Sequence, residues 1–414
     1  MSNLKIDLIA PPFHGHLHPL LGVARILKDF AQVRVITTKD AIPAVDAAGL
    51  ASAIILKGKE AAVWNIPNIG QSVRTRPWLM WRQFQQNVAL LPGLKNDLSQ
   101  LWATEKPDLA IVDFTLPTAG YLARSLGIRW WTLHPSPLAI ETGSGTPTYF
   151  GGLTPSKSAI GRTRDQLGRI CTRGFKRVIF SKFRHAFFPY GITAVYRPDG
   201  TEATYSGDKI LAVGMSELEF NQDWPRAVRF IGFTPYTPAV DRSAPDLDPA
   251  RPNVLVTFGT HLPHLRARFT DYLNHWANLC PSVCFHFTTG GLGCSNSTDA
   301  QWKSYRYLSY EEQLHRFAAV VHHGGSGITN HTLRAGLPSV VWPQDYDQFD
   351  YAARLAHAGA AIRCRNAASV PAALETVLSN PNFRARALQL SATLKSYETS
   401  TLIRQLCVEA GLAL

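Results

Sequence analysis

The sequence predicts an α/β protein with two Rossmann-like halves whose parallel sheets face each other across a cleft. At 414 residues the chain is too long for one ordinary hydrophobic core, so two domains are expected. Both halves repeat an order of buried strand, polar loop and helix, which is the order that builds a parallel sheet. A proline-rich stretch from Thr234 to Pro252 separates them. We therefore expect domains over residues 1–233 and 253–385, a linker over 234–252, and a C-terminal helix over 386–414 that packs back on the first domain.

Composition indicates a globular protein of a reducing compartment. Hydrophobic residues make up 45% of the chain, and no apolar run reaches the roughly 18 residues that a membrane-spanning helix needs. Residues 1–5 lead directly into a strand and lack the apolar segment of a signal peptide. No Cys-x-x-Cys pair occurs, which argues against a zinc site and for free thiols in a cytoplasmic protein. The scattered cysteines are Cys171, Cys280, Cys284, Cys294, Cys364 and Cys407.

Positive charge is concentrated in one segment. The formal net charge is +12, and residues 162–184 interleave Arg and Lys with Phe, Val and Ile. A basic amphipathic helix of this kind can lie on a membrane surface, so peripheral membrane contact is one interpretation. The commoner one, which we favour, is a solvated helix whose apolar side packs in the core. Nucleic-acid binding would explain the charge but not the histidines at the strand ends, and we do not expect it.

The first element predicts a strand over Lys5–Pro12, followed by a loop that contains His14, His16 and His18. Pro19 suits the first turn of the next helix, and Val33–Thr37 reads as a second strand. A βαβ unit of this type places its first loop at the carboxyl edge of the sheet, where ligands bind. The histidines could hold a metal, but no carboxylate or thiolate is local. A general base is the better interpretation, because a neutral imidazole can accept a hydroxyl proton near neutral pH.

Asp113 ends the next clear strand, which runs from Pro107. The following helix and strand, over residues 119–126 and 129–133, put Asp113 on the same edge as His16. A carboxylate there could orient a catalytic histidine and stabilise its imidazolium. The alternative is that Asp113 only caps the following helix. The remaining N-terminal strands are expected at residues 210–215 and 229–233.

The second half begins with a buried strand, Val254–Phe258, that ends in Gly259 and Thr260. A helix over residues 265–279, a strand over 283–288 and a glycine turn over 290–293 follow, and after residues 305–308 a helix is expected around 311–317. An apolar run then ends in His322-His323-Gly324-Gly325-Ser326-Gly327, before a helix over 329–335. Glycines allow close approach of a ligand, and a helix N-terminus binds anions, phosphate above all. The pattern is neither Gly-x-Gly-x-x-Gly nor a P-loop, and a simple tight turn is the alternative.

The chain then repeats the same arrangement once more and closes with helices. A strand at residues 340–342 ends in the polar run Pro343-Gln344-Asp345-Tyr346-Asp347-Gln348. Helices are expected over residues 371–378 and 383–407. The polar run therefore belongs to the same carboxyl edge as the glycine turn.

These motifs resemble the signature of family 1 nucleotide-sugar-dependent glycosyltransferases. The resemblance rests on His323-Gly324-Gly325-Ser326-Gly327, on Pro343 to Gln348, and on Gly15-His16-Leu17-His18-Pro19, which is similar to the family's Gly-His-x-x-Pro loop. It spans both halves in the right order. It implies the GT-B fold, an acceptor-binding first domain and a second domain that binds the nucleotide sugar. Bacterial members acting on polyketides, macrolides or carotenoids are closest in character.

The resemblance also implies roles for residues. His16 would be the catalytic base and Asp113 its partner, without a metal or cofactor. The donor, expected to be UDP-glucose, would meet Gly259, Thr260, Tyr307, Leu308, His323, Gly325, Ser326, Gly327, Asp347 and Gln348. Tyr307 stands where the family usually has a tryptophan stacked on uracil, so thymidine is an alternative base.

The implied reaction moves a hexose, with inversion, to a hydroxyl of a small hydrophobic acceptor. Alternatives left open are a membrane-surface enzyme with a lipid acceptor, a dTDP-deoxysugar or C-glycosylating variant, and a nucleotide-sugar epimerase or binder. The segments 63–91 and 143–190, rich in Trp and Phe, are expected to shape the acceptor pocket.

Overall fold

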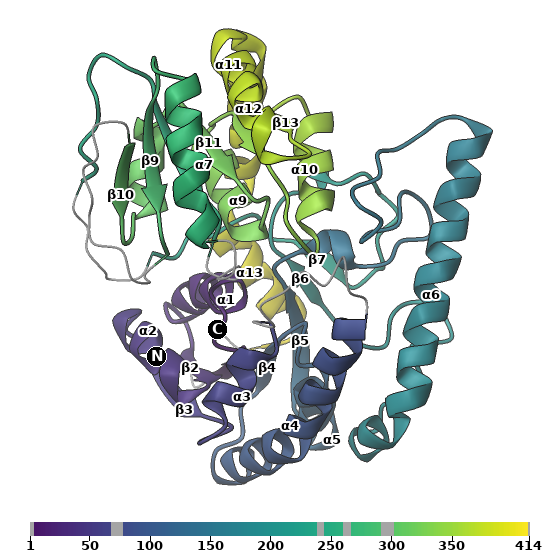
Figure 1. The fold of residues 1–414 in the computed structure, drawn as a ribbon. Helices are drawn as coiled ribbons and strands as arrows, with labels where there is room; N and C mark the ends of the chain where they lie inside the picture. The colour runs from purple at the N-terminus through teal and green to yellow at the C-terminus, as the bar shows by residue number, and fades with distance from the viewer. Residues whose placement is uncertain (1–3, 68–77, 238–243, 260–265, 291–301, 413–414) are drawn as a thin grey trace.

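The computed structural model describes residues 4–67, 78–237, 244–259, 266–290 and 302–412. Over these residues the chain forms two α/β halves, each built on a parallel sheet with helices on its faces (Figure 1). This confirms the predicted fold class. The strands are β1 (Lys5–Ile9), β2 (Gln32–Thr37), β3 (Ala51–Ile54), β4 (Leu109–Asp113), β5 (Arg129–His134), β6 (Ile210–Ala212), β7 (Val228–Phe230), β8 (Asn253–Thr257), β9 (Cys284–Thr288), β10 (Trp302–Tyr305), β11 (Ala319–His322), β12 (Ser339–Val341) and β13 (Ala361–Arg363).

The helices lie between these strands and after the last of them. The α-helices are α1 (His14–Leu27), α2 (Ile42–Ala47), α3 (Glu60–Asn65), α4 (Trp78–Thr104), α5 (Pro117–Ser125), α6 (Ala159–Phe187), α7 (Arg266–Leu279), α8 (Tyr310–Gln313), α9 (Ser326–Arg334), α10 (Gln348–His357), α11 (Val370–Ser379), α12 (Pro381–Ser396) and α13 (Thr399–Glu409). Short 3₁₀ turns occupy residues 39–41, 137–139, 188–190, 216–218, 314–316 and 367–369.

The strand order of each sheet shows where a ligand is expected to bind. The N-terminal sheet runs β3-β2-β1-β4-β5-β6-β7 and the C-terminal sheet runs β10-β9-β8-β11-β12-β13. In each sheet the order reverses direction beside its first strand, between β1 and β4 and between β8 and β11. Ligands of open parallel sheets bind outside the carboxyl ends of the strands at such a reversal. His16 and Asp113 follow β1 and end β4, while Gly259 and His323 follow β8 and β11.

Helix α1 begins earlier than predicted. The three histidines belong to its first turns and Pro19 lies inside the helix, so the expected loop and the expected first-turn proline are wrong. The helix starts because the carbonyl of Phe13 accepts hydrogen bonds from the N–H groups of His16 and Leu17, at 2.9 and 2.8 Å. His16 is consequently fixed on a helical turn rather than on a loop.

The predicted helix over residues 383–407 is two helices, α12 and α13, with a break at Tyr397 and Glu398. The break lets the Tyr397 hydroxyl donate to Glu217 at 2.8 Å and accept from the N–H of Ser216 at 3.2 Å. Gly232 lies directly against Tyr397, since a Cβ on it would stand 2.5 Å from the tyrosine Cβ. After the break, α13 packs against α1 of the N-terminal half.

Helix α6 stands along one edge of the molecule (Figure 1). We expected its apolar side to pack in the core, and this holds only in part. Ile179 is buried, and Phe180 packs on the N-terminal core. Phe175 and Val178 are instead exposed. No helix of the described residues is long and apolar enough to span a bilayer.

Candidate active site at the interface of the two halves

His16 and Asp113 are paired at the carboxyl edge of the N-terminal sheet. The Nδ1 atom of His16 lies 3.1 Å from both carboxylate oxygens of Asp113. Asp113 is fully buried, and its Oδ1 also accepts hydrogen bonds from the N–H and the hydroxyl of Thr115, at 3.0 and 2.5 Å. The carboxylate is therefore fixed, and it orients the ring so that Nε2 lies on the side away from it. The interpretation of Asp113 as a helix cap finds no support, since α5 has no side-chain cap.

The surroundings of His16 favour its protonated form. Burial lowers the pKa of the ring, but the charge and hydrogen bond of Asp113 and the charge of Asp347 outweigh burial, so the pKa is raised above the usual 6.5. The ring stacks on Phe114 with centroids 5.4 Å apart. The other face of Phe114 carries His134, at 4.1 Å. A ring held this firmly can accept a proton and stabilise the resulting charge.

The neighbouring histidines lack these features. His14 and His18 stack on each other at 4.6 Å, and neither has a carboxylate partner among the described residues. Burial, with the charges of His14 and His331, lowers the pKa of His18 to about 3. Burial also lowers the pKa of His14. His16 is thus the histidine of this turn that is best equipped to act as a base.

The glycine turn of the C-terminal half encloses His323. A Cβ on Gly259 would lie 2.9 Å from Cε1 of His323, and one on Gly325 would lie 2.5 Å from its Nε2. Only glycine leaves room for the ring at these two positions, and Gly259 also has a φ of +67°. Burial lowers the pKa of His323 to about 4. The ring is therefore neutral near pH 7 and keeps one N–H group that can donate a hydrogen bond, and a hydrogen bond with the Thr257 backbone offsets part of the effect of burial.

Helix α9 begins within this turn. Gly325 is its N-cap and has no side chain to satisfy the first N–H groups. A Cβ on Gly327 would meet nothing within 4 Å, so the space beside the first turn is open. The Ser326 hydroxyl donates to the carbonyl of Pro135 in the other half, which leaves its backbone N–H for a ligand. The turn has the properties of an anion site.

Asp347 and Gln348 lie at the start of α10. The Asp347 carboxylate accepts a 2.5 Å hydrogen bond from the hydroxyl of Ser136 in the N-terminal half, and burial raises its pKa. Gln348 uses its side-chain oxygen to accept from the N–H groups of Gln344 and Asp345, at 2.9 and 3.1 Å. Its amide nitrogen makes no hydrogen bond with the described residues, and it is the group left for a ligand.

Three predicted donor-binding residues remain: Tyr307, Leu308 and Thr260. Tyr307 is half-buried beside Tyr310 and Tyr236, and burial raises its pKa. The Leu308 side chain is buried in a cluster with Leu255, so only its backbone could face a nucleotide. Thr260 lies outside the described residues.

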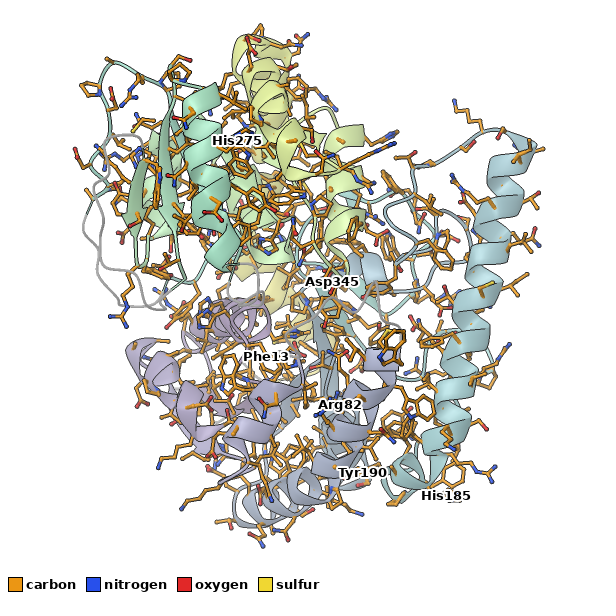
Figure 2. The ribbon with its side chains drawn as sticks, in the orientation of Figure 1. Phe13, Arg82, His185, Tyr190, His275 and Asp345 are labelled. Atoms are coloured by element: carbon orange, nitrogen blue, oxygen red, sulfur yellow. The ribbon has the colours of Figure 1, made fainter. Side chains whose placement is uncertain are left out.

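Contacts between the halves bring the two edges together, and the sequence did not reveal them. Besides the contacts of Ser136 and Pro135, the Gln83 amide donates to the Tyr346 hydroxyl at 2.9 Å. The Arg354 guanidinium donates to Glu219 at 2.6 Å, with both side chains buried. Figure 2 shows Phe13 on one half and Asp345 on the other, both at the level where the halves meet. Ser136 follows β5 by two residues. That position at the carboxyl edge of the sheet could have identified it from sequence as a candidate site residue.

The site chemistry is that of acid–base residues and an anion cradle. No group of three or more His, Cys, Asp or Glu side chains within the described ranges is arranged to hold a metal ion. A proton acceptor on one half faces a helix N-terminus, a neutral histidine and a carboxylate on the other. This arrangement suits transfer of a group from an anionic donor to a hydroxyl.

Comparison with known sequences gives matches in both parts of the chain. Residues 304–410 match the family described as Erythromycin biosynthesis protein CIII-like, C-terminal domain. The chain is 36% identical over 122 residues to the sterol 3-beta-glucosyltransferase of Kluyveromyces lactis, a match that covers 28% of this chain and only 10% of that protein. It is 25% identical over 411 residues to the O-mycaminosyltylonolide 6-deoxyallosyltransferase of Streptomyces fradiae, covering 94% and 93% of the two chains.

Comparison with solved structures shows the fold. The glycotransferase of kitacinnamycin superposes with a TM-score of 0.74 at 17% identity, covering 98% of this chain and all of that one (100%). The Streptomyces sp. SF2575 glycosyltransferase SsfS6, solved with thymidine diphosphate, gives a TM-score of 0.67 at 19% identity, over 97% and 100%. Two parallel sheets that meet at their carboxyl edges are the GT-B arrangement. In sequence the chain is similar to natural-product glycosyltransferases, and it shares the GT-B fold of the solved ones.

Proposed function

We propose that the protein is an inverting glycosyltransferase that moves a hexose from a nucleoside diphosphate sugar to a hydroxyl group of a small hydrophobic acceptor. The observation that carries this proposal is the His16–Asp113 pair, at 3.1 Å, with Asp347 of the opposite half close enough to raise the pKa of His16. In the proposal, the N-terminal half binds the acceptor and the C-terminal half binds the donor. Base and donor site thus meet at one interface.

His16 would act on the acceptor. A hydroxyl is a poor nucleophile at neutral pH, so its proton must leave as the new bond to the anomeric carbon forms. The Nε2 atom of His16 takes that proton. Asp113 keeps Nδ1 protonated and stabilises the imidazolium. Attack on the face opposite the leaving group inverts the anomeric carbon.

The glycine turn would stabilise the leaving group. As the bond to the sugar breaks, charge grows on the nucleoside diphosphate. The free N–H groups at the start of α9 and a hydrogen bond from neutral His323 meet that charge. Gly325, Ser326 and Gly327 supply the backbone, and Gly259 flanks the ribose. No divalent cation is required in this scheme.

Asp347, Gln348 and Tyr307 would select the donor. The first two would hydrogen-bond the sugar hydroxyls, and Tyr307 would stack on the base beside the backbone of Leu308. UDP-glucose is our first candidate. A dTDP-deoxysugar is the second, because Tyr307 is smaller than a tryptophan and SsfS6 was solved with thymidine diphosphate.

Aromatic side chains support a hydrophobic acceptor, such as an aromatic polyketide, a macrolide or a carotenoid. Phe13 contacts both His16, with centroids 6.0 Å apart, and Trp64, at 5.3 Å. Phe114 covers one face of His16. Such walls favour a flat apolar molecule beside the base. C-glycosylation would use the same groups.

A second candidate function is transfer to a lipid acceptor at a membrane surface. It is favoured by the exposed apolar side chains of α6 and by the similarity to sterol 3-beta-glucosyltransferases. The two functions differ in the acceptor alone. A simple binder would have no use for the His16–Asp113 pair, and an epimerase would not need an acceptor.

A thermal-shift panel of nucleotide sugars, followed by assays for product, tests the proposal. A ligand at about 100 times its Kd stabilises the fold by roughly 2.7 kcal/mol, which moves the melting midpoint by a few degrees. We expect UDP-glucose to raise the midpoint more than UDP does, or a dTDP-sugar more than dTDP. If no nucleotide sugar shifts the midpoint, the proposal is wrong. Acceptor pools of polyketides and of sterols in vesicles then separate the two acceptor classes.

A further inference from the structure

Helix α6 turns an apolar stripe toward solvent. Ile160, Leu167, Cys171 and Val178 recur at steps of seven, four and seven residues, which keeps them on one face of a helix. Their exposed fractions are 84% for Ile160, 56% for Leu167 and 63% for Val178, and Cys171 is also exposed. Ile170, beside the stripe, is 58% exposed. A helix on the surface of a globular protein normally turns its polar face toward solvent. An exposed apolar stripe of this kind therefore indicates a surface that binds another molecule.

The opposite face of α6 is held to the protein by polar anchors. Arg173 donates to Glu141 at 3.0 Å, and Lys176 donates to Glu141 at 2.6 Å and also pairs with buried Glu202. Gly161 and Gly168 are buried there and let the helix approach closely. Because these anchors fix the rotation of the helix about its axis, the stripe cannot turn inward without breaking buried ion pairs.

Basic side chains flank the stripe. Lys182 borders the stripe, and Arg177 and Arg184 lie about a quarter to a third of a turn from it, all exposed. Arg177 also lies over the ring of Tyr196 and Lys182 over that of Trp81. None of the three forms an ion pair with an acidic side chain of the described residues. A shallow hollow on the same helix is lined by Val178, Ser181, Lys182, Arg184 and His185. Figure 2 shows His185 near one end of α6, at the margin of the molecule. An apolar strip between positive groups complements a surface with apolar chains below anionic headgroups.

We propose that α6 is a membrane-docking helix that inserts its apolar stripe into the interface of a bilayer carrying anionic lipids. This binding is separate from the transfer reaction and holds whichever acceptor the enzyme uses. The aliphatic side chains enter the boundary of the acyl chains while Arg177, Lys182 and Arg184 remain at the headgroups. A second copy of the chain is a poorer occupant, because two such faces would bring like charges together.

The test is co-sedimentation of the full chain with vesicles of phosphatidylcholine alone or mixed with phosphatidylglycerol. We expect binding to the mixed vesicles only, and less binding at high salt. The stripe variant I160S/L167S/V178S and the charge variant R177Q/K182Q/R184Q should both lose it. Each basic group near an anionic surface is worth about a five-fold factor in partitioning, so three substitutions predict a loss of about 100-fold. The control L388S/V408S, which changes exposed apolar residues on α12 and α13, should bind as the parent does.

The outcomes separate the proposal from its rivals. Equal sedimentation with neutral and anionic vesicles, or full binding by the stripe variant, overturns it. A parent dimer that the stripe variant turns into a monomer in analytical ultracentrifugation also overturns it, since the stripe would then be a contact between copies. Circular dichroism and the melting midpoint show that each variant is folded. A variant that fails to fold is replaced by the single change Val178→Ser, for which a smaller loss of binding is expected.

Cys171 offers an independent readout within the stripe. An environment-sensitive fluorophore on this thiol should shift to shorter wavelength with mixed vesicles and stay unchanged with neutral ones. The Cys171→Ser variant identifies signal from any other thiol. A label on Cys171 that stays in a polar environment while the protein sediments with the vesicles would place the contact elsewhere and overturn the proposal.

Discussion

His16 and His323 occupy comparable places in the two halves, yet their surroundings give them opposite properties. Each lies at a carboxyl edge beside the reversal of strand order. His16 is paired with a buried carboxylate, and its pKa is raised. His323 lies between glycines, its Nδ1 has no hydrogen bond with the described residues, and burial lowers its pKa to about 4. The fold brings both imidazoles to the candidate site, and nearby carboxylates, Asp113 above all, give the two rings opposite pKa shifts.

The sharpest test of this contrast is His16→Ala. A general base contributes about 10²–10⁴-fold, so kcat should fall by that order on an alcohol acceptor. Nucleotide binding, measured by titration calorimetry, should stay intact because His323 and α9 belong to the other half. In the parent, kcat/KM should rise with pH through a pKa above 6.5, the usual value, as the raised pKa of His16 requires. That limb should be absent from the variant.

Asp113→Asn serves as the companion of that experiment. Its loss should be similar or smaller, and the loss in the double variant should not be the sum, since both residues serve one proton transfer. If His16→Ala keeps its rate and its pH limb while His14→Ala or His18→Ala loses both, the base has been assigned to the wrong histidine.

A smaller effect is expected on the donor side from Tyr307→Ala. Stacking of a base on an aromatic ring is worth about 1–3 kcal/mol, so the affinity for UDP or dTDP should fall by about 5- to 150-fold. Tyr307→Phe keeps the stacking face and should bind like the parent. Calorimetric titration of both nucleotides also reveals the preferred base. Unchanged affinity in Tyr307→Ala would mean that the base stacks on another aromatic residue, and Trp302 and Tyr305 are the first candidates.

Variants of Gln348 can separate an effect on sugar binding from an effect on the loop at Gln344 and Asp345. Gln348→Glu keeps the oxygen that accepts from Gln344 and Asp345 but removes the amide nitrogen. Loss of one hydrogen bond costs about 0.5–1.5 kcal/mol, so kcat/KM for the nucleotide sugar should fall by about 3- to 10-fold. Gln348→Ala should lose at least as much and also melt earlier. A parent-like kcat/KM in both variants would show that Gln348 does not contact the sugar.

The last expected effect is on the stability of the fold in acid rather than on the reaction. Burial lowers the pKa of His134 and His322 to about 3 and that of His323 to about 4. A base with a lowered folded pKa contributes stability that is present above the unfolded value of 6.5 and is lost as pH falls toward the folded value. His16, with a raised pKa, acts in the opposite direction. The buried histidines outnumber it, so the melting midpoint should fall by several degrees from about pH 7 to about pH 5.

His322 gives a control for this effect. His322→Asn keeps an acceptor for the N–H of Gly324, which lies 3.1 Å from Nδ1, but cannot titrate. Its midpoint should depend less steeply on pH than that of the parent. A midpoint that stays level in acid for the parent would mean that the buried rings take up protons without loss of structure.

The position of the candidate site could be predicted from sequence because it depends on strand ends. Alternating strands and helices fix which loops share an edge, so His16 and Asp113 were placed together although 97 residues separate them. Glycines at residues 324, 325 and 327 predicted an anion site at the second edge, and the structure places an uncapped helix N-terminus there. Both inferences depend only on the local order of strands, loops and helices and on the right-handed connection between parallel strands.

Contacts that depend on how the halves pack could not be predicted. Ser136 and Asp347 are 211 residues apart, and no periodicity relates them. The orientation of α6 was missed for a similar reason. Apolar residues occur on both of its faces, so the pattern alone does not say which one is buried. Glu141 and Glu202, from other elements, decide it by pairing with Lys176.

The break at Tyr397 has a mechanical consequence. The chain passes from one half to the other after Gly232 and returns at Tyr397, and these two positions touch. Gly232 and Gly214 exchange backbone hydrogen bonds of 2.8 and 3.1 Å at the same place. Two chain connections that lie side by side restrict rotation of one half against the other more than a single linker would. In the proposed reaction, the same restriction would keep Asp347 in register with His16.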